Sequence, residues 1–203
     1  MSRMGMLAAV VVAPLAQGPF AVLLGVTCVG WFILELRQGL TRRTEAVTAD
    51  RGSLTVLRAA YVGGALVAIW AERALPAAAI RPEALGAWLG LIFLWSGIAL
   101  RLWSFRTLGR YFTFTVQTSS DQPVITGGPY RVVRHPGYTG LLLAVTAISF
   151  FFGNWVSTMC LAVAATAGLM YRIRVEERAL VQTLGDRYRD YAATRKRLVP
   201  LVW

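Results

Sequence analysis

The chain has 203 residues, of which 56% are apolar, and its mean hydropathy is +0.54. Soluble domains are about 45–50% apolar, so this composition argues against an ordinary soluble domain and indicates a membrane protein. The net charge of +11 comes from 21 basic residues set against 10 acidic ones. Because cytoplasmic loops of membrane proteins collect Arg and Lys, we attribute this excess to membrane topology and expect no nucleic-acid partner.

Apolar segments predict about five transmembrane helices, since a spanning helix needs about 20 apolar residues. In chain order, these segments are 18–36, 54–75, 84–104 and a run at 137–171 that "GNW" at 153–155 divides into two arms. Each arm has only about 16 residues, which is short for a full crossing. We therefore expect a tight helical hairpin, with a locally thinned bilayer or shielding by other helices. Residues 5–17 either extend the first span or lie at the interface.

The distribution of basic residues predicts the orientation. If the polar segments 37–53, 105–136 and 172–203 all face the cytoplasm, these segments and the helix ends beside them hold 18 of the 21 basic residues, and Arg3, Arg73 and Arg81 lie on the other side. A bias of this size follows the positive-inside rule. It predicts an outside N-terminus and a cytoplasmic C-terminus, in what we interpret as the inner membrane of a prokaryotic cell.

Metal sites and soluble nucleotide sites find no support in the sequence. His135 is the only histidine, and Cys28 and Cys160 both lie inside apolar runs. This inventory argues against a zinc site, so we expect no metal. No GxGxxG motif follows a strand pattern, which argues against a Rossmann-type cofactor site.

Two polar segments, Tyr111–Tyr138 and Tyr171–Pro200, fall on the same predicted side and flank the hairpin, which brings them together. In the first segment, His135 could line a pocket there or only flank a helix that starts at Pro136. Tyr130 and Tyr138 could likewise be ordinary interfacial aromatics.

In the second segment, Arg172 and Glu176 are four residues apart and therefore share a helix face. They form either an interfacial ion pair or part of a functional cavity, since charges close to hydrocarbon tend to face polar cavities. Beyond them lies a basic tail, for which we expect contacts with membrane lipid headgroups. Its basic residues are Arg187, Arg189, Arg195, Lys196 and Arg197.

Taken together, "GGPYRVVRHPGYTG", the apolar hairpin and "RIRVEERALVQTLGDRYRDYAATRKRLVP" resemble the isoprenylcysteine carboxyl methyltransferase family. The shared pattern is Gly-x-Tyr and Arg-His-Pro-x-Tyr-x-Gly before the hairpin. After the hairpin come Arg-x-x-x-Glu, Leu, Gly-x-x-Tyr-x-x-Tyr and a closing Val-Pro. The resemblance covers about half of the chain, residues 105–200. It implies an all-α integral membrane enzyme of prokaryotic type that uses S-adenosylmethionine and is unrelated in fold to Rossmann-like methyltransferases.

The resemblance also implies where the site lies. The cofactor site of the family is formed on the cytoplasmic side by the loop before the last hairpin and the helix after it. Carried over by position, the cofactor-binding residues are Gln117, Gln122, Pro123, Val124, Ile125, Tyr130, His135, Pro136, Gly137, Tyr138 and Glu176. Arg172 matches the arginine assigned to the substrate, and we expect Arg172 and Glu176 to carry catalysis. The chain departs from the family at Gln122, where animal members tend to have histidine, and at Gly137, which replaces serine.

We interpret residues 1–203 as one membrane domain, with three N-terminal spans in 1–104 and the catalytic core in 105–203. The expected reaction transfers a methyl group to a hydrophobic, membrane-partitioned acceptor, either a lipophilic small molecule or a lipidated one. A carboxylate like that of isoprenylcysteine is favoured, because it is ionised at neutral pH and needs no base. Methylation of a phenolic, pyrone or thiol lipid, phospholipid amine N-methylation, and a non-enzymatic binding or transport role remain alternatives. The sequence does not indicate an oligomeric state.

Overall fold

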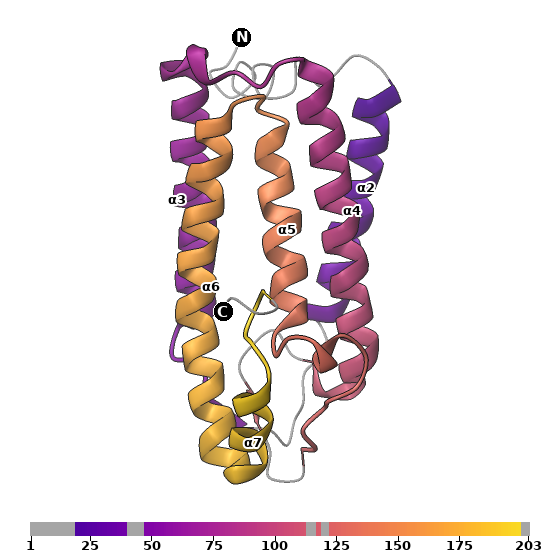
Figure 1. Ribbon diagram of the computed structural model, residues 1–203, viewed down its shortest axis with the longest axis vertical. Coiled ribbons are helices and arrows are strands. Elements are labelled where there is room, and N and C mark those ends of the chain that lie inside the picture. The colour runs from indigo at the N-terminus through magenta and orange to yellow at the C-terminus, as the bar shows by residue number, and fades with distance from the viewer. Residues whose placement is uncertain (1–18, 40–46, 113–116, 119–121, 200–203) are drawn as a thin grey trace.

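The computed structural model describes residues 19–39, 47–112, 117–118 and 122–199, and it forms an elongated bundle of helices (Figure 1). The α-helices are α2 (Pro19–Gly39), α3 (Ser53–Ala74), α4 (Glu83–Leu108), α5 (Pro136–Phe150), α6 (Trp155–Leu184) and α7 (Asp186–Thr194). Three 3-10 turns, η1 (Pro76–Ala78), η2 (Gly109–Tyr111) and η3 (Gly128–Arg131), connect them. Two short strands, β1 (Val47–Thr48) and β2 (Gln117–Thr118), pair antiparallel. The prediction of an all-α membrane fold is confirmed.

The lengths of the helices distinguish spans from other elements. Within the described part of the chain, α3, α4 and α6 are long and apolar enough to cross a membrane, and α5 is a shorter apolar helix. With 15 residues, α5 measures about 22 Å, less than the hydrocarbon thickness of about 30 Å. The 30 residues of α6 extend about 45 Å, so this helix continues well past its predicted apolar arm. The helix α2 coincides with the first predicted span, and the five-span count stays a prediction.

The two arms of the predicted hairpin pack mainly against other helices. Figure 1 shows α6 beside α3, and α5 beside α4, with α2 on the outer side of α4. The break that the sequence shows at "GNW" is a helix cap, because the Asn154 side-chain oxygen accepts from the backbone N–H groups of Val156 and Ser157 at 2.9 and 3.1 Å. The Asn154 amide also donates to the Leu75 carbonyl at 2.8 Å, which ties this turn to the end of α3.

Small residues allow the closest helix contacts. A Cβ added at Gly97 of α4 would lie 2.6 Å from the Gly140 carbonyl oxygen of α5, and one at Gly168 of α6 would lie 2.9 Å from Cβ of Ala60 in α3. Close approach at small residues is typical of membrane helices, where packing has to replace the hydrophobic effect as the driving force.

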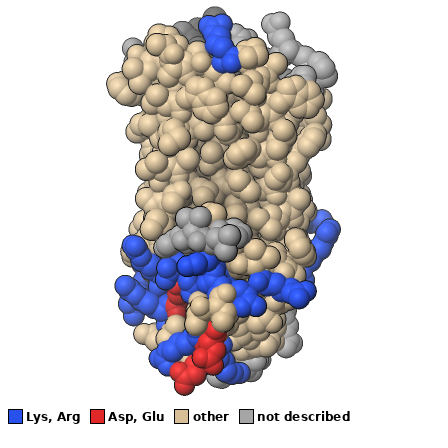
Figure 2. Space-filling view, in the orientation of Figure 1, with Lys and Arg blue, Asp and Glu red and all other residues tan. Residues whose placement is uncertain are grey.

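The outer surface divides into an apolar body and a charged end. Most of the surface in Figure 2 carries no charge, whereas Lys and Arg gather at the lower end, where α3 and α5 begin and α4 and α6 end. Large apolar side chains such as Phe32 and Val163 are 67% and 63% exposed, which is expected of surfaces that face lipid. This end is called the charged end below.

Candidate active site

A pocket opens at the charged end of the bundle. It lies between the ends of α4, α5 and α6 found there, the loop residues that precede α5, and α7. The space inside it, together with the open solvent at its mouth, is about 880 Å³. The residues that line it are Arg101, Leu108, Tyr111, Phe112, Gln122, Pro123, Val124, Ile125, Tyr130, Arg134, His135, Gly137, Tyr138, Arg172, Glu176, Leu180, Leu184, Tyr188 and Tyr191. Charged and aromatic side chains therefore share the walls with leucines.

Ten of the twelve residues assigned to the site from the sequence line this pocket. They come from both sides of the hairpin: Gln122–Ile125, Tyr130, His135, Gly137 and Tyr138 precede it, and Arg172 and Glu176 follow it. The other two lie outside the lining. Pro136 is fully buried as the first residue of α5, and Gln117 belongs to β2, where it pairs with Thr48.

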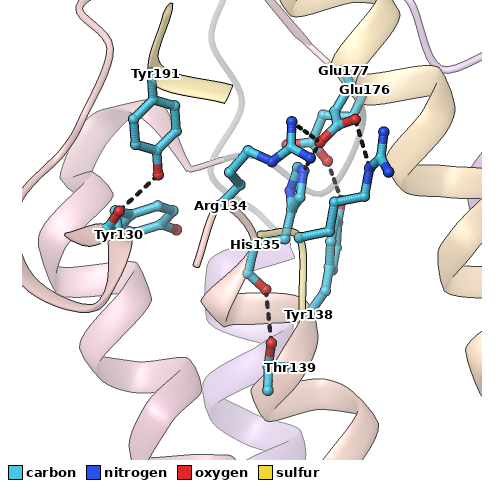
Figure 3. A network of polar contacts seen from close by, with 9 residues as sticks. Tyr130, Arg134, His135, Tyr138, Thr139, Glu176, Glu177 and Tyr191 are labelled. Carbon is cyan, nitrogen blue, oxygen red and sulfur yellow. Dashed lines mark hydrogen bonds and ion pairs between the residues drawn. The ribbon is translucent and has the colours of Figure 1, made fainter. Parts of the chain in front are cut away.

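Tyr138 connects the two predicted catalytic residues. Its hydroxyl donates to Glu176 Oε2 at 2.6 Å (Figure 3) and accepts from Arg172 Nε at 2.8 Å. The sequence spacing predicted an Arg172–Glu176 pair on one helix face. The structure instead joins the two side chains through a tyrosine from the other side of the hairpin, so a change at either residue reaches the other by way of one hydroxyl.

Asp50 is a partner of Arg172 that the sequence analysis missed. Arg172 Nη1 donates to Asp50 Oδ1 at 2.9 Å and to Ser53 Oγ at 3.0 Å. Burial acts to raise the pKa of Asp50, but hydrogen bonds from Ser53 and from the backbone N–H of Leu54, together with Arg172, outweigh burial and hold the pKa below its usual value. The available signal was an acidic residue directly before an apolar span, but only tertiary contact brings it to Arg172.

A second network surrounds Glu177, the neighbour of the predicted acid. Glu177 Oε1 lies 3.1 Å from both His135 Nε2 and Arg134 Nη1, and Oε2 accepts from Arg197 Nε at 2.9 Å (Figure 3). His135 thus lines the pocket and also occupies the N-cap position of α5. Flanking the helix does not keep this residue out of the pocket. An ionised Glu177 places the imidazole proton on Nε2, because a carboxylate only accepts.

The C-terminal segment is hydrogen-bonded to the loop that precedes α5 and contains Arg134 and His135. The backbone N–H groups of Arg134 and His135 donate to the carbonyls of Lys196 and Arg197 at 2.8 and 3.0 Å. Thr139 Oγ1 donates to the Leu198 carbonyl at 2.8 Å. Contacts of the basic tail with lipid headgroups stay a prediction. In the structure, backbone carbonyls of the tail bind the loop before α5 and the first turn of α5.

Arg101 is a buried charge in the part of α4 that lies toward the charged end. It is 3% exposed and forms a two-pronged ion pair with Glu35 of α2. Its Nη1 donates to the Gly137 carbonyl at 2.8 Å, and its guanidinium lies 4.7 Å from the centre of the Phe105 ring. Arg101 therefore ties α2, α4 and the start of α5 together and also lines the pocket.

Comparisons with known proteins agree with this geometry. Residues 88–182 match the isoprenylcysteine carboxyl methyltransferase family. A probable protein-S-isoprenylcysteine O-methyltransferase from Oryza sativa subsp. indica is 32% identical over 108 residues, covering 52% of this chain and 56% of the relative. Methanethiol S-methyltransferase 2 from Bradyrhizobium diazoefficiens is 27% identical over 144 residues, covering 66% of this chain and 54% of the relative. The chain thus spans about half the length of these curated relatives.

Similarity in structure points the same way. The solved structure of the eukaryotic intramembrane Ras methyltransferase, an isoprenylcysteine carboxyl methyltransferase, superimposes with a TM-score of 0.56 and 27% sequence identity. The similarity covers 71% of this chain and 52% of that one. Together with the matched segment, which contains α5 and most of α4 and α6, this similarity supports an assignment to the isoprenylcysteine carboxyl methyltransferase family.

Proposed function

We propose that this protein is a membrane enzyme that transfers a methyl group from S-adenosylmethionine to a hydrophobic acceptor. The observation that carries the proposal is the pocket at the charged end, in which Tyr138, Arg172 and Glu176 from both sides of the hairpin are joined by hydrogen bonds. Its place at the end of an apolar bundle suits a soluble cofactor and a membrane-partitioned acceptor. The family assignment supports the same reaction.

The residues of the pocket fit S-adenosylmethionine, which carries a sulfonium, an ammonium and a carboxylate. Glu176 offers a carboxylate for the ammonium, and the rings of Tyr130 and Tyr138 offer faces that attract a sulfonium. Two buried polar atoms of the pocket wall, on Arg134 and Tyr188, have no partner within the described residues. Buried groups of this kind usually find partners, so a polar ligand suits them. When bound, the cofactor supplies an electrophilic methyl group.

For the protein, the task is to align the acceptor and exclude water. We assign Gln122–Ile125, Tyr130, His135, Gly137, Tyr138 and Glu176 to cofactor binding and Arg172 to the acceptor. The segment 122–125 and residues Tyr188 and Tyr191 of α7 line the same pocket. Pro136 contributes by starting α5, and Gln117 lies in β2. We interpret residues 1–203 as one domain, an interpretation that the contact of Ser53 in α3 with Arg172 supports.

The acceptor we favour is a carboxylate on a lipid-like molecule, which the positive charge of Arg172 in the pocket lining attracts. A thiol is the second candidate, because one relative is named a methanethiol S-methyltransferase. A thiol must lose a proton before it attacks, and for this acceptor we assign that proton to the carboxylate of Glu176, which lines the pocket.

One experiment tests the reaction and the acceptor class together. The purified protein is titrated with S-adenosylmethionine in a calorimeter and then incubated with methyl-labelled cofactor and a prenylcysteine, a long-chain thiol or a total lipid extract. We expect saturable cofactor binding and label in an apolar product. Label in the prenylcysteine supports the carboxylate, label in the thiol supports S-methylation, and label in phospholipid would move the assignment to amine N-methylation. Absence of cofactor binding contradicts the proposal as a whole.

We further propose that the charged end faces the cytoplasm of a prokaryotic inner membrane, following the positive-inside rule. In a variant with Cys28 and Cys160 replaced by Ala, a cysteine at the exposed Thr194 of α7 should react with a membrane-impermeant thiol reagent only in inverted vesicles. A cysteine at the exposed Ala77 of η1, at the opposite end of the bundle, should react in intact cells. The reverse pattern would overturn the orientation.

A further inference from the structure

Two buried polar atoms on one wall of the pocket lack a hydrogen-bond partner among the described residues. They are Tyr188 Oη, in a side chain that is 5% exposed, and Arg134 Nε. Both residues line the pocket, although Arg134 comes from the loop before α5 and Tyr188 from α7. An unsatisfied buried donor is costly and rare, and two of them on one wall indicate that a ligand supplies the missing partner.

The chemistry of these two atoms specifies that partner. An arginine Nε can only donate. Burial raises the pKa of Tyr188, and Glu177 and Glu176 raise it further, so the hydroxyl keeps its proton at neutral pH and can donate as well. Two buried donors in residues that line the same pocket favour a ligand group with acceptor oxygens that reaches them when it binds.

The charge of the neighbourhood favours an anionic acceptor. Arg134 Nη1 lies 3.1 Å from Glu177 Oε1. The Glu177 carboxylate also contacts His135 at 3.1 Å and Arg197 at 2.9 Å. Because one carboxylate is shared among these groups, the positive charge of Arg134 is only partly compensated. A carboxylate is the group that an arginine and a phenol together bind best.

We propose that Tyr188 Oη and Arg134 Nε bind the methionyl carboxylate of S-adenosylmethionine, an inference that rests on the function proposed above. Glu176, which lines the same pocket, binds the neighbouring ammonium. Since the carboxylate and the ammonium are attached to one carbon, the two subsites have to adjoin. The Gly-x-x-Tyr-x-x-Tyr motif, to which Tyr188 belongs, thereby has a ligand-binding role in addition to its role in packing.

The test compares two ligands that differ only in the part at issue. S-adenosylhomocysteine carries the carboxylate and ammonium, whereas 5′-methylthioadenosine keeps the adenosine and thioether but lacks both. Calorimetric titration of Tyr188→Phe should show affinity for S-adenosylhomocysteine reduced about tenfold, the usual effect of losing a hydrogen bond to a charged group. Affinity for methylthioadenosine should be unchanged. Arg134→Lys, which keeps the charge beside Glu177 but loses Nε, should show the same selective loss.

Tyr61→Phe is the matched control. Tyr61 Oη is another buried hydroxyl without a partner in the described chain, but Tyr61 lies on α3 and is not among the residues lining the pocket. This variant should bind both ligands as the parent does. Neither phenylalanine variant should lower the melting temperature of the ligand-free protein, because each removes an unsatisfied polar atom.

The outcomes separate this inference from the proposed function. If the parent binds S-adenosylhomocysteine but Tyr188→Phe loses affinity for both ligands equally, or for neither, the carboxylate assignment is wrong while cofactor binding stands. If the parent binds neither ligand, the proposed function fails and this assignment fails with it.

Discussion

Glu176→Ala is expected to weaken S-adenosylmethionine binding about 10- to 100-fold, because a hydrogen-bonded charge pair contributes about 1.5–3 kcal/mol and each 1.4 kcal/mol is a factor of ten. Arg172→Ala is expected to leave cofactor affinity within about threefold of the parent and to lower turnover or raise the acceptor KM. The physical reason is the division of the site, with Glu176 on the cofactor and Arg172 on the acceptor. Calorimetry of each variant, followed by steady-state kinetics with the acceptor identified above, measures both effects.

Two further variants examine how strongly the cofactor-binding part of the site is coupled to the acceptor-binding part. Tyr138→Phe removes the hydroxyl that bonds both Arg172 and Glu176, so it should impair both cofactor affinity and acceptor turnover, each less than the corresponding alanine variant. Arg172→Lys should restore acceptor turnover only in part, because lysine lacks the planar fork. Equal loss of cofactor affinity in Arg172→Ala and Glu176→Ala would contradict the division and favour a purely structural cluster.

Gly97→Leu is expected to prevent stable packing of α4 against α5. A Cβ at this position would already lie 2.6 Å from the Gly140 carbonyl oxygen and 2.7 Å from the Ala144 nitrogen, and both are backbone atoms that cannot rotate away. Overpacking costs about 1–3 kcal/mol even where side chains can adjust, so we expect a larger effect here. Because Arg101 and Gly137 lie on these two helices and line the pocket, cofactor binding should be lost together with stability. Thermal unfolding in detergent and cofactor titration measure these effects.

Gly63→Leu provides the control for this change. Gly63 lies within α3, and a Cβ added there meets nothing within 4 Å. Replacement of this glycine should leave the melting temperature and cofactor affinity close to those of the parent. If Gly97→Leu also unfolds at the temperature of the parent, the close contact between α4 and α5 does not determine the shape of the pocket.

The sequence by itself determined the helices and the region of the site. Apolar runs predicted α2, α3 and α4 to within a few residues, for example 84–104 against Glu83–Leu108, because hydrophobic length is a local property. For α6 they predicted only the apolar part, which ends at 171 whereas the helix continues to Leu184. The turn at 153–155 was predicted from "GNW", and it is where Asn154 caps α6. The family resemblance of the motifs on both sides of the hairpin also identified ten residues that line the pocket.

Only the tertiary structure decided which side chains contact one another. Helical spacing paired Arg172 with Glu176, but the position of Arg172 depends on Asp50, which lies 122 residues earlier in the chain. Glu176 and Glu177 are neighbours in sequence, yet one bonds Tyr138 and the other bonds His135. Successive residues on a helix point about 100° apart, so the packing of α6 against α5 and the C-terminal segment selects their partners. Contacts between distant segments depend on how the helices are arranged in space, and local sequence patterns carry no information about that arrangement.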